Sequence, residues 1–175
     1  MAEQQPLSTR KETLMSQEKT FHSTDLPNPA PKNSIVVGHD GSEGANYAFI
    51  MALELGEQLS TPVIVVRSWS TLTVPPPTDR EVGYASSFDE YASAVREEMI
   101  RTLQKTAESF GTVQVAYEPV HAPPAESLIA ASRDARMLVV GTRGHGRLAG
   151  MLLGSVSEKC VRHAVCPVLV VRPRD

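Results

Sequence analysis

Apolar residues along this chain follow two alternating patterns, one typical of buried strands and one typical of amphipathic helices. Short runs of β-branched and other apolar residues recur between turn residues, and most are continuously apolar, as in strands buried on both faces of a sheet. The runs predict five strands, at residues 35–38, 63–66, 113–117, 137–140 and 168–171. The second run continues toward Trp69.

The segments between these runs carry apolar residues at three- and four-residue steps, which is the spacing of one helix face. They predict four helices, containing residues 45–59, 92–110, 125–129 and 155–165. Pro123 and Pro124 precede the short third helix, where proline suits the first turn. Ser155 and Glu158 have the spacing of a capping box, so the fourth helix is expected to begin there.

Strands that alternate with helices predict an α/β fold, because right-handed crossovers produce a parallel sheet with helices on both faces. We therefore expect a five-stranded, doubly wound parallel sheet. The pattern alone does not give the strand order. If the order is 3-2-1-4-5, the loops after the first and fourth strands flank the crevice where such folds bind ligands. These loops contain Asp40 and residues 141–155.

Two segments fall outside this regular pattern. Residues 1–32 are polar and end in a cluster of three prolines, so they cannot bury enough apolar surface to offset their ordering entropy. They are expected to form a flexible tail, with a short helix docking on a partner as the alternative, and residues 33–175 to form the domain. Residues 70–87 contain Pro75–Pro77 and no period, which predicts a loop.

Composition excludes several classes of partner. The chain has 175 residues, which suits one domain, and a net charge of −3, which gives no global attraction to nucleic acid or to an anionic membrane. It has no apolar run of about 18 residues and no signal peptide pattern, so no membrane association and a cytoplasmic location are expected. Cys160 and Cys166 fit neither a disulfide framework nor a zinc site and are expected to be reduced, packed thiols.

The segment from Gly141 to Ser155 carries the chemistry. Glycines at 141 and 144 are expected to let backbone amides approach a ligand, and Gly154-Ser155 adds an amide and a hydroxyl at a helix N-terminus, where an anion is favoured. Arg143 adds positive charge, as a phosphate contact or as an ordinary surface charge. The segment matches neither a P-loop nor the dinucleotide fingerprint. It predicts a phosphate cradle, and the alternative is a merely flexible loop.

Three regions together resemble the universal stress protein family, in its ATP-binding subclass. The spacing G-x₂-G-x₉-G-[ST] after the fourth strand resembles that family's nucleotide-binding signature. Residues 37–42, Val-Gly-His-Asp-Gly-Ser, resemble its first strand and aspartate, and residues 166–171 resemble its last strand. The likeness covers roughly residues 33–173. It implies the strand order 3-2-1-4-5, with ATP, alone or with magnesium, bound across the switch point.

Carried over by position, the resemblance also implies the binding residues. Asp40 is expected on the ribose or adenine side, the backbone near Ser68 at the adenine, and the glycine segment with the first turn of the last helix at the ribose and phosphates. The full set is Gly38, His39, Asp40, Ser68, Val140, Gly141, Arg143, Gly144, Gly154, Ser155, Val156 and Ser157. His39 replaces a residue that is usually apolar or small in the family, which is expected to tighten or alter the pocket mouth. The last strand, Val168, Leu169, Val170 and Val171, is the implied homodimer interface.

Three functions remain open at this point. Asp40 is the only carboxylate that the sequence places near the site, whereas fast phosphoryl transfer needs several metal-holding groups and a positioned base. The leading interpretation is therefore an ATP-binding regulatory protein of the stress response, dimeric, with slow or no hydrolysis. The alternatives are a slow ATPase or phosphotransferase completed by a partner subunit, and a dimeric scaffold that binds no nucleotide.

Overall fold

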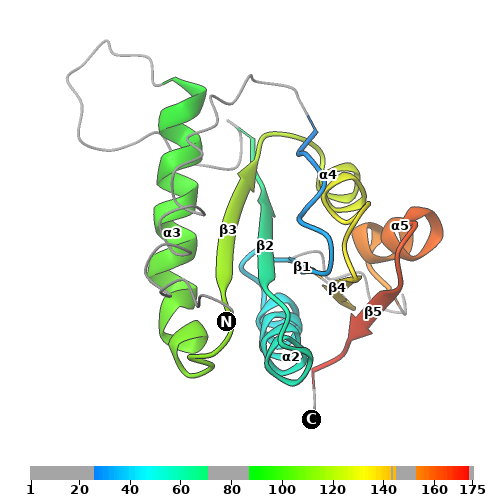
Figure 1. The fold of residues 1–175 in the computed structure, drawn as a ribbon. Helices are drawn as coiled ribbons and strands as arrows, with labels where there is room; N and C mark the ends of the chain where they lie inside the picture. The colour runs from blue at the N-terminus through cyan, green and yellow to red at the C-terminus, as the bar shows by residue number, and fades with distance from the viewer. Residues whose placement is uncertain (1–25, 71–86, 143, 145–152, 174–175) are drawn as a thin grey trace, which may run out of the picture.

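The computed structural model describes residues 26–70, 87–142, 144 and 153–173, and strands alternate with helices throughout these ranges (Figure 1). The elements are β1 (Ile35–Gly38), α2 (Glu43–Leu59), β2 (Val63–Ser68), α3 (Phe88–Glu108), β3 (Val115–Val120), α4 (Pro124–Ala131), β4 (Met137–Gly141), α5 (Ser155–His163) and β5 (Val168–Val171). The third strand thus begins two residues later than predicted and ends three residues later. The other strands lie where their apolar runs predicted them.

The five strands form one parallel sheet in the order β3-β2-β1-β4-β5. The predicted fold class and strand order are confirmed. Because β1 lies at the centre with β2 and β4 on its two sides, the chain leaves β1 toward one edge and returns to the other. The switch point of the sheet is therefore at the carboxyl ends of β1 and β4.

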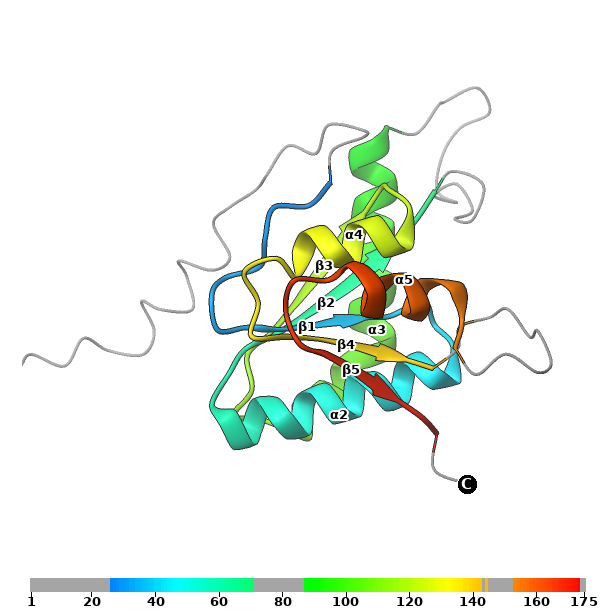
Figure 2. The same ribbon diagram turned by 90° about the vertical axis from the view of Figure 1, so that its right-hand side faces the viewer.

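Alternation along each strand divides the core between two faces. Val37, Val65 and Val139 face α2 and α3, where Phe49 and Met99 are fully buried. Val36, Ile64, Leu138 and Val140 face α4 and α5. Figure 2 shows α4 and α5 above the sheet and α2 below it. The sheet is thus covered on both faces, which explains why its strands are continuously apolar.

Side chains cap the first two helices, and the last helix begins differently from its prediction. Ser42 caps α2 through a hydrogen bond from the Ala45 amide, and Ser87 forms a capping box with Glu90 in α3. The capping box predicted at Ser155 is wrong. Gly154 is the N-cap of α5, Ser155 is already its first helical residue, and the helix ends at His163 rather than Val165.

The end of the predicted tail contacts the domain. Ala30 is buried, and its amide donates to the Ala131 carbonyl at 2.7 Å, so this part of the predicted tail packs against the end of α4. Residues 1–25 and most of the predicted 70–87 loop lie outside the described residues. No helix in the described ranges is long and apolar enough to cross a membrane.

Candidate nucleotide-binding site

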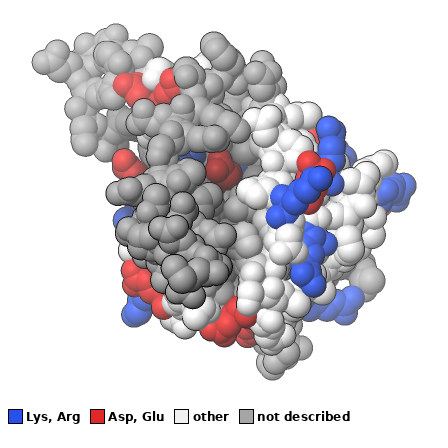
Figure 3. All heavy atoms as spheres, viewed as in Figure 1, with Lys and Arg blue, Asp and Glu red and all other residues white. Residues whose placement is uncertain are grey.

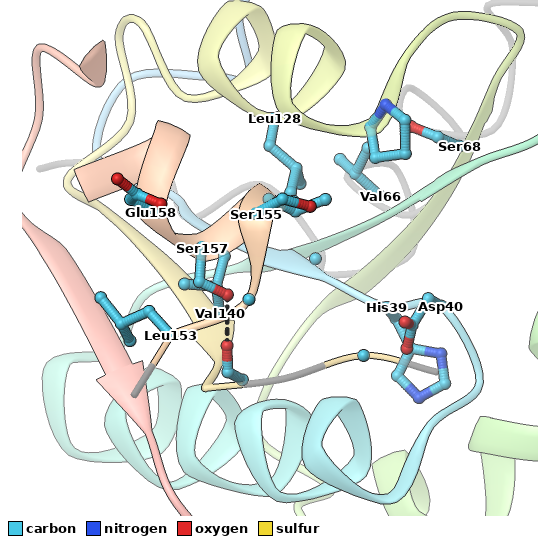
Figure 4. A pocket seen from close by; sticks show the side chains of 16 residues that line it. His39, Asp40, Val66, Ser68, Leu128, Val140, Leu153, Ser155, Ser157 and Glu158 are labelled. Atoms are coloured by element: carbon cyan, nitrogen blue, oxygen red, sulfur yellow. Dashed lines mark hydrogen bonds between the residues drawn. The ribbon is translucent and has the colours of Figure 1, made fainter. Parts of the chain in front are cut away.

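A pocket of about 450 Å³ opens at the carboxyl edge of the sheet, between the first turns of α4 and α5 (Figure 4). This volume is in the range of small-molecule sites. All the site residues expected from the sequence that the structure describes line it: Gly38, His39, Asp40, Ser68, Val140, Gly141, Gly144, Gly154, Ser155, Val156 and Ser157. Arg143 lies outside the described residues. The pocket occupies the switch point of the sheet, where doubly wound folds bind ligands.

Five further residues line the pocket that sequence reasoning did not assign to it: Val66, Pro124, Leu128, Leu153 and Glu158. Val66 has a signal in the sequence, because it stands two positions before Ser68 on the same strand and therefore shares its face. Pro124 and Leu128 come from α4, whose first turn lies beside the pocket. No local pattern indicates that contact, because it arises from the packing of α4 on β1 and β2.

The first turn of α5 supplies the anion-binding end of the pocket. Gly154 has extended backbone angles (φ −73°, ψ 159°), and no side chain caps this turn within the described residues. The Gly154 amide donates to the Thr142 carbonyl at 2.8 Å, so it is used inside the protein rather than for a ligand. The next three amides, from Ser155 to Ser157, lie in the first turn of α5. The N–H groups of a first helix turn have no acceptor within the helix. Together with the helix dipole, these amides favour an anion.

Ser157 connects this helix turn to the sheet. Its hydroxyl donates to the Gly141 carbonyl at 2.6 Å, and the residue is almost completely buried (Figure 4). The Ser157 side chain therefore fixes α5 against the end of β4. Sequence reasoning assigned Ser157 to ribose and phosphate contact and gave no signal for this structural role.

The glycines at the pocket allow parts of the protein to approach each other. A Cβ atom on Gly141 would lie 2.7 Å from the Gly44 carbonyl oxygen, so Gly141 permits close packing of β4 on α2. A Cβ atom on Gly144 would collide with the Asp40 carboxylate. The sequence suggested that Gly141 and Gly144 let backbone amides of the protein approach a ligand. In the structure the space beside each glycine is taken by the Gly44 backbone or by the Asp40 carboxylate, so both glycines also serve packing within the protein.

Asp40 has a structural role that is compatible with ligand contact. Its Oδ1 accepts a hydrogen bond from the Ser42 amide at 2.9 Å, which stabilises the turn between β1 and α2. The residue is exposed and lines the pocket, and its carboxylate is next to Gly144 of the glycine segment. Asp40 thus contacts both loops at the switch point, its own loop after β1 and, at Gly144, the loop after β4.

The His39 ring lies on the opposite face of the sheet from the pocket. It is buried, with Nε2 at 2.9 Å from Asn46 Oδ1 and Nδ1 at 3.2 Å from Arg67 Nη2. Arg67 also donates through Nε to the His39 carbonyl and pairs with Glu98 at 3.2 Å. Because Arg67 can only donate, Nδ1 is the acceptor and Nε2 carries the proton. The His39 side chain is thus held by contacts on the α2 side of the sheet, although the residue also lines the pocket.

Comparison with known proteins identifies the family to which this chain belongs. The sequence pattern of the universal stress protein family matches residues 32–172. The chain belongs to this family. Universal stress protein Rv2005c of Mycobacterium tuberculosis is 34% identical over 157 residues, covering 87% of this chain and 50% of that protein. The chain thus spans about half the length of the curated relatives it matches.

Solved structures of universal stress proteins share the fold. The chain superposes on UspA of Lactobacillus plantarum with a TM-score of 0.62 at 16% identity, covering 81% of this chain and 99% of that one. A universal stress protein in complex with cAMP gives 0.59 at 24% identity, covering 83% and 100%. The Archaeoglobus fulgidus protein in complex with dAMP gives 0.53 at 19% identity, covering 83% and 98%.

Two carboxylates, rather than one, line the pocket of this universal stress protein. Glu158 reaches it from α5 and forms an exposed pair with Arg162 at 2.7 Å, while Asp40 lies on the β1 side (Figure 4). Within residues 26–70, 87–142, 144 and 153–173 there is no group of three or more His, Cys, Asp or Glu side chains placed to hold a metal ion.

Charged side chains are unevenly distributed on the surface. In the view of Figure 3, Lys and Arg gather on the side of α4 and α5, and Asp and Glu lie mostly toward the other side. Lys159 of α5 pairs with Glu126 of α4 at 3.4 Å, but exposed pairs of this kind add little stability.

The buried His39 makes stability depend on pH. Burial lowers the pKa of His39 below its ordinary 6.5, and Arg67 lowers it further, while the Asn46 hydrogen bond and the charges of Asp40 and Glu98 oppose the shift. Below about pH 6.5 the unfolded chain takes up a proton that the folded chain resists, so stability is full above that pH and falls as the pH drops.

We expect His39→Gln to lose part of this pH dependence. Urea unfolding measured between about pH 7.5 and pH 5 should show a smaller loss of unfolding free energy for His39→Gln than for the unaltered chain. His163→Gln is the matched control, because His163 is exposed and should keep the original slope. If the unfolding free energy changes equally with pH in all three proteins, His39 does not cause the pH dependence of stability.

Proposed function

We propose that this universal stress protein is an ATP-binding regulatory module with slow or no hydrolysis. The observation that carries the proposal is the pocket itself, which joins an apolar end to an uncapped helix N-terminus at the switch point of the sheet. A nucleotide has matching parts, with a flat, mostly apolar base at one end and phosphates at the other.

The two ends of the pocket differ in chemistry. Val66, Leu128 and Pro124 form an apolar surface beside the end of β2, which suits a base. The amides of the first α5 turn suit phosphates, and Asp40 lies near the β1–β4 switch point, in reach of the sugar between them. The solved neighbours with cAMP and with dAMP are both complexes of adenine nucleotides, which favours adenine as the base.

The groups that line the described part of the pocket support regulation rather than turnover. The pocket offers no described cluster of metal ligands, and Glu158 is paired with Arg162. Magnesium, which prefers phosphate oxygens and waters with one or two carboxylates, would be carried mainly by the nucleotide, with Asp40 or Glu158 as the protein ligand. A bound nucleotide acts by favouring the conformation or assembly that binds it.

The assembly we propose is a homodimer formed through β5. This strand is the edge of the sheet, and Val168, Leu169 and Val170 are only half-buried in the single chain. Val165, just before it, is 75% exposed. An apolar edge strand is an association site unless it is covered. The edge is close to the pocket because Val171 accepts a hydrogen bond from the Thr142 amide, at the start of the glycine segment.

Titration of the full chain with ATP tests this proposal. At an ATP concentration about 100-fold above Kd, binding should stabilise the protein by about 2.7 kcal/mol and raise Tm by roughly 5–10 °C. Sedimentation velocity on the same sample should give twice the mass of one chain. Phosphate release at saturating ATP should stay far below about 1 per second.

Each of the three measurements can contradict a different part of the proposal. No calorimetric heat and no rise in Tm at millimolar ATP would contradict nucleotide binding and favour a scaffold. Turnover at ordinary enzyme rates would contradict the regulatory reading and favour an ATPase completed by a partner subunit. A monomer in the presence of bound ATP would contradict the β5 interface alone.

A further inference from the structure

A positively charged side chain, Arg67, lies on the face of the sheet opposite the pocket. Val63 and Val65 precede it at two-residue steps and pack against α2 and α3, so Arg67 faces the same side. Its side chain is only 11% exposed. A largely buried guanidinium loses most of its hydration, and an ion pair seldom offsets that cost. Net stability alone therefore does not account for an arginine at this position.

All three nitrogens of the Arg67 guanidinium have partners. Nη1 pairs with Glu98 of α3 at 3.2 Å. The other two nitrogens reach His39, Nη2 at the ring Nδ1 and Nε at the main-chain carbonyl, each at 3.2 Å. The far side of the ring is held by Asn46 of α2 at 2.9 Å. Because a guanidinium presents its donors in a rigid plane, this arrangement fixes the ring and the main chain of His39 together.

The His39 carbonyl lies where the hydrogen-bond ladder of the sheet ends. β1 ends one residue earlier, and the His39 amide makes one further bond, to a β2 carbonyl at 3.0 Å. The His39 carbonyl then accepts from the Arg67 side chain. Since the peptide bond is planar, fixing this carbonyl also fixes the amide with which Asp40 begins. Gly41 follows with φ 89°, a conformation typical of a turn. Arg67 thus sets the point from which the Asp40 turn leaves the sheet.

Asp40 connects this arrangement to the pocket. Figure 4 shows His39 and Asp40 beside each other after β1, apart from Ser155 and Ser157 of α5. Asp40 is exposed and lines the pocket, whereas Arg67 points to the α2 and α3 side. An effect of Arg67 on a ligand would therefore pass through the main chain of His39 and not through direct contact.

We propose that Arg67 is a positioning residue for nucleotide binding, which places Asp40 at the pocket by holding the His39 carbonyl. The inference rests on the proposed nucleotide function and adds to it a residue on the far face of the sheet. Glu98 makes α3 part of the same arrangement, because it holds the third nitrogen of the guanidinium. The alignment concerns the nucleoside, since the phosphates are expected at the first turn of α5.

Binding of two probes to Arg67→Met tests this role. Methionine keeps an unbranched side chain but has no donor for His39. Calorimetry should show ATP affinity reduced about 10-fold, as for the loss of one hydrogen bond to a charged group. Tripolyphosphate, which has no nucleoside, should bind Arg67→Met and the unaltered chain equally. Unchanged ATP affinity would overturn the inference, and so would an equal loss for both probes, which would indicate a general effect of charge.

The matched control is Arg96→Met, which removes the same charge from another arginine. Arg96 lies on α3 and forms an exposed pair with Glu118 of β3 at 3.7 Å, far from the His39 carbonyl in its contacts. Arg96→Met should bind ATP and tripolyphosphate as the unaltered chain does. A loss of ATP affinity in Arg96→Met equal to that in Arg67→Met would contradict a specific role for Arg67.

Arg67→Lys separates geometry from charge. Lysine can still pair with Glu98, but it lacks the planar fork that reaches the His39 ring and carbonyl together. We expect Arg67→Lys to lose about as much ATP affinity as Arg67→Met. Full ATP affinity in Arg67→Lys would overturn the positioning role. This variant also decides the question if Arg67→Met does not fold.

A double-mutant cycle with Asp40 provides a measurement that a merely structural role would not change. Asp40→Ala should lower ATP affinity, and Arg67→Met added to Asp40→Ala should lower it less than about 2-fold further, because both changes act on one contact. A further loss of about 10-fold, as for independent sites, would overturn the inference. So would an Asp40→Ala protein that binds ATP as well as the unaltered chain.

The outcomes distinguish this inference from the proposed function. If the unaltered chain binds ATP and the Arg67 variants bind it equally well, only the positioning role fails. If the unaltered chain binds no ATP, the proposed function and the positioning role both fail.

Discussion

Replacing Gly154 by valine should weaken ATP binding at least about 100-fold, which corresponds to the loss of two hydrogen bonds to charged groups. Gly154 is the N-cap of α5 and lines the pocket where the helix amides face the phosphates. A branched side chain there would stand in front of those amides. The fold should persist, because the extended backbone at this position (φ −73°, ψ 159°) is one that valine adopts readily.

Calorimetry with ATP and circular dichroism of the same samples measure both parts of this prediction. Gly111→Val is the matched control, because Gly111 is exposed and an added Cβ would meet only the Glu108 carbonyl, at 3.7 Å. That variant should bind ATP as the unaltered chain does. If Gly154→Val keeps its ATP affinity, the phosphates do not bind at the first turn of α5.

Gly141→Ala should destabilise the protein by about 2–3 kcal/mol, the usual cost of overpacking a close contact. The new methyl group would lie 2.7 Å from the Gly44 carbonyl oxygen and 3.3 Å from the Ala45 amide nitrogen. These are backbone atoms at the start of α2, so they cannot rotate away as a side chain would. The whole of α2 would have to move from β4, and the Ser157 hydrogen bond to the Gly141 carbonyl would be disturbed.

Urea denaturation without nucleotide is the appropriate measurement, because it isolates packing from ligand binding. Gly111→Ala serves as the control and should change the unfolding free energy little or raise it slightly, since the chain there has room for a methyl group. A Gly141→Ala protein with unchanged stability but weakened ATP binding would restore the original idea that this glycine makes space for the ligand.

Much of the fold follows from local patterns in the sequence. Strands such as Ile35–Gly38 and Val168–Val171 are short apolar runs between turns, and burial on both faces demands that composition. The strand order does not follow from any local pattern and came from the resemblance of three motifs to a family. The helix start at Gly154 was misplaced by one residue, because the spacing of Ser155 and Glu158 imitates a capping box.

The sequence predicted which loops form the candidate site, but it did not predict what each residue does there. Glycine spacing and the first-strand aspartate indicated the two loops that meet at the switch point. The same pattern could not show that Gly141 fits against Gly44, or that the His39 ring points to the α2 side, because those contacts join residues that only the folded sheet brings together. Leu128 and Glu158 were missed for the same reason.

The division of the core by the sheet has a practical consequence for protein engineering. The pocket draws its side chains from the α4 and α5 face, whereas Phe49, Leu53 and Met99 fill the α2 and α3 face. A thermostable biosensor scaffold can therefore be sought by redesigning the α2 and α3 layer alone, with the recognition layer left untouched. The Arg67 and His39 pair should be retained in such a redesign, because it anchors the main chain that leads to Asp40.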